Sequence, residues 1–322
     1  MGLEDLIAID TQNPGADYGH IRRYLTTALQ DRGASVHVVA GSVLGTWETP
    51  RILFNAHMDT VRAEGWTRNP LRAWKQRGRI YGLGACDTKG SIHAILEATK
   101  NGAQDVAVLF STDEECGPQT GANRFFKTAV GKTLAKTLQG AVVMEPTENH
   151  VYTRHPGYVQ AELIFAGSTG HSSSLKPSAA GVAVETLHRL QHHAGWNVNV
   201  SAIHAEAAGA NVRASACNAT VSIRSYQNAS IVVKEIGKAL PNGTAMRIVQ
   251  AEGPLDNKKP FIASKTEVPF WTDAATLASA GINTVVYGPG NIQQAHKPNE
   301  YVSEAGLEKA GAFLKRLARI PQ

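Results

Sequence analysis

The order of apolar runs and helix-like segments is the feature of this sequence that most restricts its fold. Four short β-branched runs in the first half are typical of buried strands, at 35–40, 51–57, 106–112 and 140–146. Segments with helical periodicity alternate with them, at 3–9, 18–33 and 89–102. Strands that alternate with helices usually form sheets covered on both faces. The pattern therefore predicts an α/β fold with a mixed, mostly parallel sheet and helices on both faces.

The pattern changes near Gly157. Strand-like and helical runs now follow in the order β-α-β-β-α-β, from "YVQAELIFAG" at 158–167 to "AMRIVQA" at 245–251. This order is typical of a small, ferredoxin-like α+β domain.

The α/β style returns after this segment, with a helix, a strand and a helix expected over 270–281, 283–288 and 303–320. We therefore predict a larger domain formed by residues 1–156 and 253–322. The smaller domain, 157–252, is expected as an insertion into it.

Length and composition describe an ordinary globular protein. The chain has 322 residues, enough for about two domains, and its 43% apolar and 18% charged residues exclude a disordered protein. No apolar run approaches the roughly 18 residues of a membrane span, and the start "MGLEDLIAID" lacks the design of a signal peptide. Three cysteines without metal-type spacing, Cys86, Cys116 and Cys217, favour a reduced compartment, so we expect a cytoplasmic protein.

The net charge of +5 raises the question of nucleic-acid binding. Lys and Arg are scattered, with only short groupings such as "RNPLRAWKQRGR" at 68–79, and no DNA-binding motif or aromatic-rich basic repeat is present. We therefore expect neither nucleic acid nor a membrane as partner. A basic balance would help to attract small anionic substrates.

Three predicted strands end in side chains that bind metals. His57 and Asp59 follow one strand, Glu114 and Glu115 another, and Glu145 the third. Because sites in open α/β sheets form at the carboxyl ends of strands, we expect these side chains to converge.

Two further candidates lie in loops, Asp87 in "GLGACDTKG" before a helix and His296 in "GPGNIQQAHKPNE". Taken singly, the candidates have plainer explanations: a turn or surface pair for His-x-Asp, a solvated face for Glu-Glu, and a helix N-cap for Asp87. Nucleotide binding is excluded, because Asp87 occupies the third glycine position of a G-x-G-x-x-G motif and Phe126 the first glycine position of a P-loop. Taken together, two histidines and three carboxylates suit zinc, and a shared carboxylate can hold two ions close together.

Five motifs carry a resemblance to a known family: "AHMDTV", "GLGACDTKG", "STDEECG", "VMEPT" and "YGPGNIQQAHKPNEYV". In content and order they resemble the acetylornithine deacetylase and succinyl-diaminopimelate desuccinylase family of di-zinc amidohydrolases, over nearly the whole chain. The resemblance implies a zinc aminopeptidase-like fold for the larger domain and a lid and dimerisation domain for the insertion. It also implies a homodimer with two Zn²⁺ per chain, for which Co²⁺ or Mn²⁺ are substitutes.

The resemblance implies a ligand set as well. His57, Asp87 and Glu145 would hold one zinc. Asp87, Glu115 and His296 would hold the other, so that Asp87 bridges the two ions.

Roles for the neighbouring residues follow from this ligand set. Glu114 would be the general base and afterwards the acid that protonates the leaving amine, while Asp59 would accept the free ring N–H of His57. The family often has a cis peptide after the bridging aspartate, here the Asp87–Thr88 bond. Cys86 and Cys116 flank two ligands, and we interpret both as packing residues.

Three residues of the inserted domain match functional positions of the family. His171 would reach the oxyanion in a neighbouring subunit's site, and Asn211 and Arg224 would line the substrate pocket, with Arg224 suited to a substrate carboxylate. Two departures from the family pattern, Ser215 and Pro156 in place of a proline and a basic residue, leave the substrate details open.

The resemblance is strongest to enzymes that deacetylate N-acetyl-ornithine or N-acetyl-citrulline in arginine biosynthesis. We therefore expect a zinc-dependent amidohydrolase that acts on an N-acyl amino acid. The alternatives are a succinyl-diaminopimelate desuccinylase, a dipeptidase, a carrier-linked lysine or ornithine hydrolase and, outside enzymes, a silent ligand-binding homologue.

Overall fold

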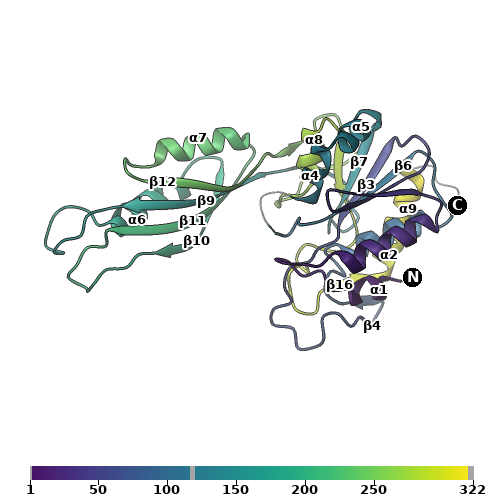
Figure 1. The fold of residues 1–322 in the computed structure, drawn as a ribbon, viewed down its shortest axis with the longest axis horizontal. Coiled ribbons are helices and arrows are strands. Elements are labelled where there is room, and N and C mark those ends of the chain that lie inside the picture. Colours follow the sequence, from purple (N-terminus) through teal and green to yellow (C-terminus); the bar gives the residue numbers. More distant parts are fainter. Residues whose placement is uncertain (1, 117–119, 318–322) are drawn as a thin grey trace. The chain divides into compact units, whose positions relative to one another are not determined.

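The structure is a computed structural model that describes residues 2–116 and 120–317 (Figure 1). Its contacts divide the chain into two compact units. The first unit comprises Met1–Arg154, Asn257–Val268 and Thr272–Gln322, and the second comprises His155–Asp256 and Pro269–Trp271. The range predicted as an insertion, 157–252, lies inside the second unit. None of the helices in the described ranges combines the length and the apolar character that crossing a membrane requires.

The first unit contains most of the helices. They are α1 (Leu3–Ala8), α2 (Gly19–Gln30), α3 (Lys89–Ala98), α4 (Gly121–Lys127), α5 (Ala129–Thr137), α8 (Ala274–Ser279) and α9 (Glu304–Leu317). Its long central strands are β3 (Ile52–His57), β6 (Val106–Ser111), β7 (Gly140–Met144) and β15 (Thr284–Tyr287). The remaining strands are β1 (Ser35–Val39), β2 (Ser42–Thr46), β4 (Trp74–Gln76), β5 (Arg79–Tyr81), β8 (Tyr152–His155), β14 (Lys265–Glu267) and β16 (Tyr301–Ser303). The last residue of β8, His155, already belongs to the second unit.

The main sheet of this unit has the strand order β1-β2-β6-β3-β7-β15-β8, and β14 pairs with β8. The central pairs β6–β3, β3–β7 and β7–β15 are parallel, whereas β1–β2, β2–β6 and β15–β8 are antiparallel. The predicted mixed, mostly parallel sheet is therefore confirmed. Three short strands form a separate sheet with the order β16-β5-β4. In the sequence, β4 and β5 come directly before the loop that leads into α3.

Both faces of the central part of the main sheet are buried, because every residue of β6 and β7 is buried. Alternate residues on strands point to opposite faces. One set, which includes Phe54, Val108 and Val142, forms a single core with α1, α2, α3 and α9. The other set, which includes Leu53 and Leu109, is equally buried on the face where α4 and α8 lie against the sheet. Helices on both faces thus explain why the strands are continuous apolar runs.

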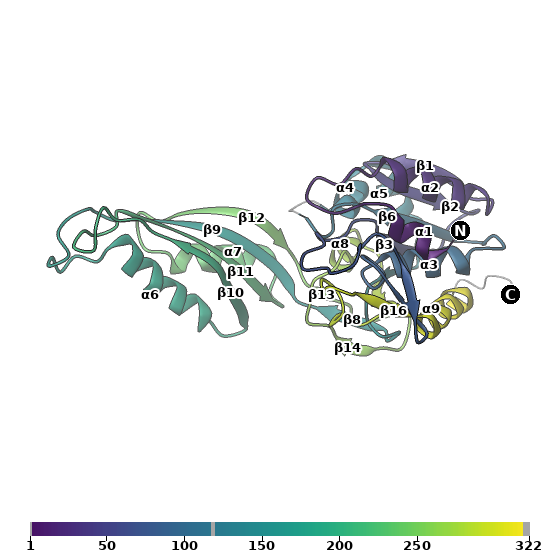
Figure 2. The same cartoon turned by 90° about the horizontal axis from the view of Figure 1, so that it is seen from below.

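The second unit has a different construction (Figure 2). Its strands are β9 (Gly157–Ala166), β10 (Trp196–His204), β11 (Ala216–Ser225) and β12 (Ala245–Glu252), its helices are α6 (Ala179–Gln191) and α7 (Ala229–Ala239), and the short β13 (Leu255–Asp256) follows. The sheet order is β10-β11-β9-β12 and all three pairings are antiparallel. This is the ferredoxin-like β-α-β-β-α-β arrangement that the sequence predicts.

Within the described part of the chain, helices cover only one face of this smaller sheet. Alternate residues of β9 and β11, such as Leu163 and Val221, pack with α6 and α7 into one core, and the residues between them remain partly exposed. This burial on one face explains why apolar and polar residues alternate in the sequence of these strands.

The structure also contains elements that the sequence patterns do not predict. Strand β2 and helices α4 and α5 are the main ones. The helix expected over 270–281 is shorter and begins only after Asp273. The end of the helix expected over 303–320 lies outside the described residues, as does Gly117 of the "STDEECG" motif.

Candidate metal centre

The predicted metal-binding side chains lie at one edge of the main sheet. His57 is the last residue of β3, Glu145 directly follows β7, and Glu114 and Glu115 follow β6 by a few residues. Because β3 lies between β6 and β7 and runs parallel to both, their carboxyl ends meet at the same edge. The topology therefore brings these four side chains together.

Asp87 stands at the centre of the cluster. Its Oδ1 lies 3.1 Å from Nε2 of His57, and its Oδ2 lies 3.5 Å from Nε2 of His296. The same nitrogen of His296 lies 2.8 Å from Oε1 of Glu115. The two oxygens of one carboxylate are thus directed at two different histidines.

Groups of close donor atoms extend this geometry. Within 4.8 Å of one another lie ligand atoms of His57, Asp87 and Glu145, and likewise those of Asp87, Glu115 and His296. Asp87 belongs to both groups, as the resemblance implies for a bridging ligand. A third group joins His57 with Glu114 and Glu115. Imidazole nitrogens and carboxylate oxygens in sets of three are donors that suit Zn²⁺ and related dications.

The electrostatics of the cluster also fit a cationic occupant. Burial, reinforced by the charge of Glu145, raises the pKa of Glu114 well above its usual range. Burial and the charge of Asp87 do the same to the pKa of Glu145. Carboxylates held together at low dielectric resist ionisation unless positive charge is near. Dications would supply that charge.

Protons on the histidines compensate part of this negative charge. Hydrogen bonds to Asp87 and Glu115 raise the pKa of His296 to about 11. Burial disfavours the charge on Asp87, but the hydrogen bonds with His296 and His57 outweigh it and hold the pKa of Asp87 below its usual range. Since a metal binds only neutral imidazole, ligation would displace these protons.

The backbone around Asp87 agrees with the sequence prediction. The Asp87–Thr88 peptide bond is cis. The Thr88 hydroxyl donates to the main-chain oxygen of His57 at 2.8 Å and so ties the loop to the end of β3. Thr88, rather than Asp87, is the N-cap residue of α3, which rules out the alternative that Asp87 serves only as a helix cap.

Asp59 has more contacts than the sequence predicts. The Nδ1 atom of His57 lies 3.0 Å from the main-chain oxygen of Asp59 and 3.4 Å from its carboxylate Oδ1. The same carboxylate accepts the backbone N–H of Glu115 at 2.9 Å and that of Glu114 at 3.3 Å. Asp59 therefore contacts the ring of His57 and also holds the segment that carries both glutamates.

A hydrogen-bond network beside Glu114 has no signal in the sequence. Asp113 has a left-handed backbone (φ 58°), and its carboxylate accepts hydrogen bonds from Tyr18, at 2.7 Å, and from Asn13, and pairs with Arg124. Asn13 also donates to Asp59 at 2.9 Å. Asp113 thus anchors the turn that leads into Glu114.

A comparison with protein families decides the classification. Residues 53–320 match the model described as Peptidase family M20/M25/M40. The chain belongs to this family. Its members act on amide bonds and depend on metal, which confirms the predicted class of enzyme.

Individual relatives of this M20 chain include deacetylases. It is 29% identical to the N-acetyl-L-citrulline deacetylase of Xanthomonas campestris pv. campestris, over 98% of this chain and 96% of that protein. It is 28% identical to the acetylornithine deacetylase of Myxococcus xanthus, over 98% and 95% of the two chains.

Solved structures show the same fold at lower identity. The aminopeptidase PepT of Bacillus cereus superposes with a TM-score of 0.78 at 16% identity, covering 98% of this chain and 96% of that one. Human carnosine dipeptidase 1 superposes with a TM-score of 0.69 at 15% identity, covering 99% and 96%.

The remaining predicted site residues of this M20 chain belong to the second unit. His171 pairs with Val212 in an isolated bridge, and its Nδ1 lies 2.7 Å from the Ser173 hydroxyl. Asn211 is exposed, and Arg224 on β11 lies over the ring of Tyr158 at 5.2 Å. The close donor groups found among the described residues contain first-unit side chains alone.

The two cysteines beside the cluster lie outside these donor groups. Cys86 is buried and its Sγ donates to the main-chain oxygen of Asn291 at 3.3 Å. Burial raises the pKa of the Cys86 thiol well above its usual range, and the pKa of Cys116 is raised for the same reason. Thiols that resist ionisation are poor metal ligands.

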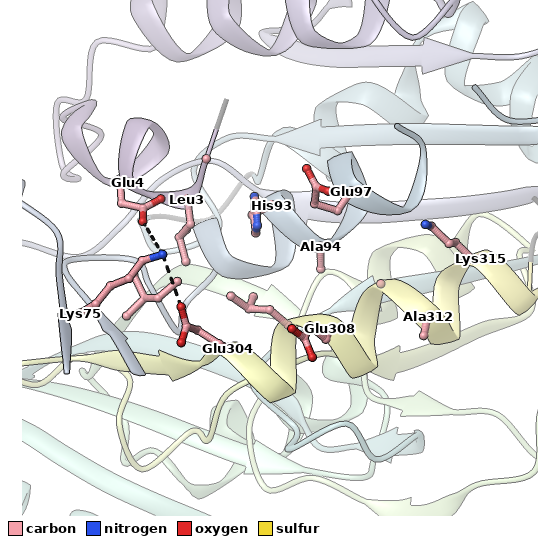
Figure 3. Close-up of a pocket in the computed structure, with 14 residues that line it drawn as sticks. Leu3, Glu4, Lys75, His93, Ala94, Glu97, Glu304, Glu308, Ala312 and Lys315 are labelled. Atoms are coloured by element: carbon pink, nitrogen blue, oxygen red, sulfur yellow. Dashed lines mark ion pairs between the residues drawn. The ribbon is translucent and has the colours of Figure 1, made fainter. Parts of the chain in front are cut away.

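A pocket of about 580 Å³ lies elsewhere in the first unit, between α1, α3 and α9 (Figure 3). Its lining includes His93 and an ion pair of Lys75 with Glu4 and Glu304. None of the close donor groups contributes to it. A smaller pocket of about 280 Å³ does reach the cluster, because His296 lines it. Arg62 and Trp66 are among its other lining residues.

Proposed function

We propose that the protein is a two-metal deacylase that hydrolyses the amide bond of an N-acyl amino acid. N-acetyl-ornithine and N-acetyl-citrulline are the proposed substrates, and arginine biosynthesis in the cytoplasm is the proposed context. The observation that carries this proposal is the placement of Asp87, whose two carboxylate oxygens face two histidines, each with its own glutamate. The names of the two deacetylase relatives support the substrate class.

The proposed ligands are those implied by the resemblance. His57, Asp87 and Glu145 hold one Zn²⁺, and Asp87, Glu115 and His296 hold the other. Ions bound there supply Lewis acidity to the amide carbonyl and lower the pKa of an attacking water. Co²⁺ or Mn²⁺ are compatible with the same donors.

Glu114 then acts as the proton carrier. It lies half-buried among the proposed ligands, close to His57 and Glu115, and its segment is held by Asp59. Its carboxylate takes a proton from the attacking water and passes it to the leaving nitrogen of the amide. A general base needs a carboxylate that is not bound to metal. The two adjacent glutamates therefore have different roles: Glu115 binds metal and Glu114 transfers the proton.

The second unit completes the proposal. His171 is assigned to the oxyanion in a neighbouring subunit's site, and Arg224 and Asn211 to the substrate. The planar guanidinium of Arg224 is suited to bidentate binding of the carboxylate that an N-acyl amino acid carries.

A homodimer formed through the second unit is part of the same proposal. Strand β10 is an edge strand of its sheet, and beside it α6 lines a groove of about 500 Å³. Val184 and Ile203 on this groove are 60% and 53% exposed. An unpaired edge strand beside exposed apolar side chains is typical of a surface that pairs with another copy. Light scattering should give the mass of a dimer for the parent and of a monomer for Val184→Glu; a monomeric parent would contradict this part.

A substrate panel tests the catalytic proposal. The purified protein, loaded with Zn²⁺, is assayed on N-acetyl-ornithine, N-acetyl-citrulline, N-succinyl-diaminopimelate and dipeptides, and its metal content is measured by elemental analysis. We expect about two ions per chain and the highest kcat/KM on one of the acetylated amino acids. Two bound ions without cleavage of any amide would refute the deacylase, and a preference for dipeptides would change the substrate class.

A further inference from the structure

Three backbone N–H groups of the loop that carries Asp87 bind one buried carboxylate, that of Glu300. Oε1 of Glu300 accepts the backbone N–H of Cys86 at 2.7 Å and that of Asp87 at 2.9 Å. Its Oε2 accepts the N–H of Gly84 at 3.1 Å. Glu300 is only 2% exposed, so these hydrogen bonds form away from solvent.

Strand pairing explains why Glu300 reaches this loop. Strands β5 and β16 are antiparallel, with Tyr81 opposite Tyr301. In an antiparallel pair the residue before Tyr301 lies beside the residue after Tyr81, and the N–H of Gly82 accordingly donates to the main-chain oxygen of Glu300 at 3.0 Å. The short sheet thus fixes Glu300 next to the start of the loop.

A carboxylate suits this position better than any neutral side chain. Three N–H groups point at it, and an ionised carboxylate offers two acceptor oxygens and no donor. A glutamine would keep one acceptor oxygen and turn an NH₂ group toward at least one N–H. The buried charge in turn depends on these three donors.

The same short segment contacts Asp87 from two directions. His296, four residues before Glu300, faces the Asp87 side chain with its ring, at 3.5 Å from Oδ2. Glu300 meanwhile binds the backbone N–H of the same residue. The segment 296–300 therefore contacts both the side chain and the backbone of Asp87.

We propose that Glu300 is a positioning residue, which fixes the loop 84–87 so that the Asp87 carboxylate faces His57 and His296 at the same time. The part of this inference that concerns metal binding rests on the proposed function above. Hydrogen-bonding partners behind metal ligands typically change metal affinity about 10- to 100-fold when they are removed.

The test uses Glu300→Gln, which keeps the shape of the side chain, with Glu308→Gln on the exposed side of α9 as matched control. Amide hydrogen exchange of the metal-free protein should be at least about tenfold faster at Gly84, Cys86 and Asp87 in the Glu300 variant only. Competition with a chromophoric chelator should show Zn²⁺ affinity reduced about 10- to 100-fold. Excess Zn²⁺ should restore part of kcat, because the residue acts through a ligand.

Two results would overturn the inference. One is unchanged exchange in the loop. The other is faster exchange with unchanged Zn²⁺ affinity, which would leave Glu300 a role in stability alone. If Glu300→Gln does not fold, Glu300→Asp keeps the charge on a shorter side chain, and the same two measurements decide. A parent that binds Zn²⁺ but cleaves no amide would refute the deacylase without affecting either measurement.

Discussion

Both units of the chain pack helices against a sheet, but they bury very different side chains. The ionisable residues buried in the first unit include His57, Asp59, Asp87, Lys89, Glu145, Asp273 and Glu300. In the described part of the second unit, the buried ionisable side chains are His155 and the thiol of Cys217. Burying charge opposes folding, whereas an apolar core favours it. The first unit therefore carries a folding cost, and the proposed metal site accounts for the part of it that falls on His57, Asp87 and Glu145.

The two units should also respond to acid in opposite directions when metal is absent. In the first unit the pKa values of Glu114 and Glu145 are raised well above their usual range, mainly by burial. Groups with a raised pKa bind protons more readily when folded, so the stability they provide is present at low pH and is lost as pH rises. In the second unit burial lowers the pKa of His155 to about 4. The stability that depends on this histidine is therefore present at neutral pH and is lost as pH falls.

The largest expected effect tests the division of roles in the first unit. Glu114→Ala should lower kcat by about 10²- to 10⁴-fold, because it removes the proton carrier, and should leave metal content unchanged. Glu115→Ala is the matched control and should lose metal as well as activity. Elemental analysis and steady-state kinetics measure both. Near-normal turnover of Glu114→Ala would remove Glu114 from its role.

The next prediction concerns the buried histidine of the second unit. The unfolded chain protonates His155 near its ordinary pKa of 6.5, but the folded unit does so only near 4. The second unit should therefore lose on the order of 3 kcal/mol of stability between pH 6.5 and pH 4 and none above that range.

His155→Gln should remove this loss, since glutamine does not titrate. Amide exchange of β9 core residues such as Leu163 at several pH values measures the effect within the unit. His204→Gln, on a histidine that is 68% exposed, is the control and should behave as the parent. If His155→Gln lost as much stability in acid as the parent, the loss would come from other titrating groups.

The smallest expected effect concerns the network beside Glu114. Tyr18→Phe removes the hydroxyl that donates to Asp113 at 2.7 Å, while Arg124 and Asn13 remain. One hydrogen bond of this kind is worth about 1 to 2 kcal/mol, so kcat should fall about 5- to 30-fold with little change in KM. Tyr24→Phe is the control, because its hydroxyl has no hydrogen-bond partner among the described residues. Equal kinetics in both variants would show that the turn holds without Tyr18.

The positions of the proposed ligands could be predicted from the sequence because they depend on topology. An apolar run identifies a buried strand, and the residue after a parallel strand lies at the carboxyl edge of the sheet. His57, Glu115 and Glu145 follow this rule. Asp87 and His296 lie in loops, where hydrophobic periodicity gives no information. Both are predicted as ligands from the sequence motifs that contain them.

The residues that support the site could not be predicted in this way. Glu300 is separated from the backbone groups that it binds by more than 200 residues, and Asn13 from Asp113 by 100. Such contacts depend on how loops close in three dimensions, and no local spacing encodes them. Short elements such as β4, β5 and β16 are missed for a related reason, since three residues do not establish a period.

One structural asymmetry has a kinetic consequence. The proposed ligands His57, Asp87 and Glu145 are between 2% and 6% exposed, whereas the His296 side chain, on the other side of Asp87, is 49% exposed. An ion held through His296 would therefore exchange with solvent faster than the ion beside His57. On dilution or mild chelation the protein would pass through a state with one ion per chain, and the rate of refilling from that state would set how quickly activity returns.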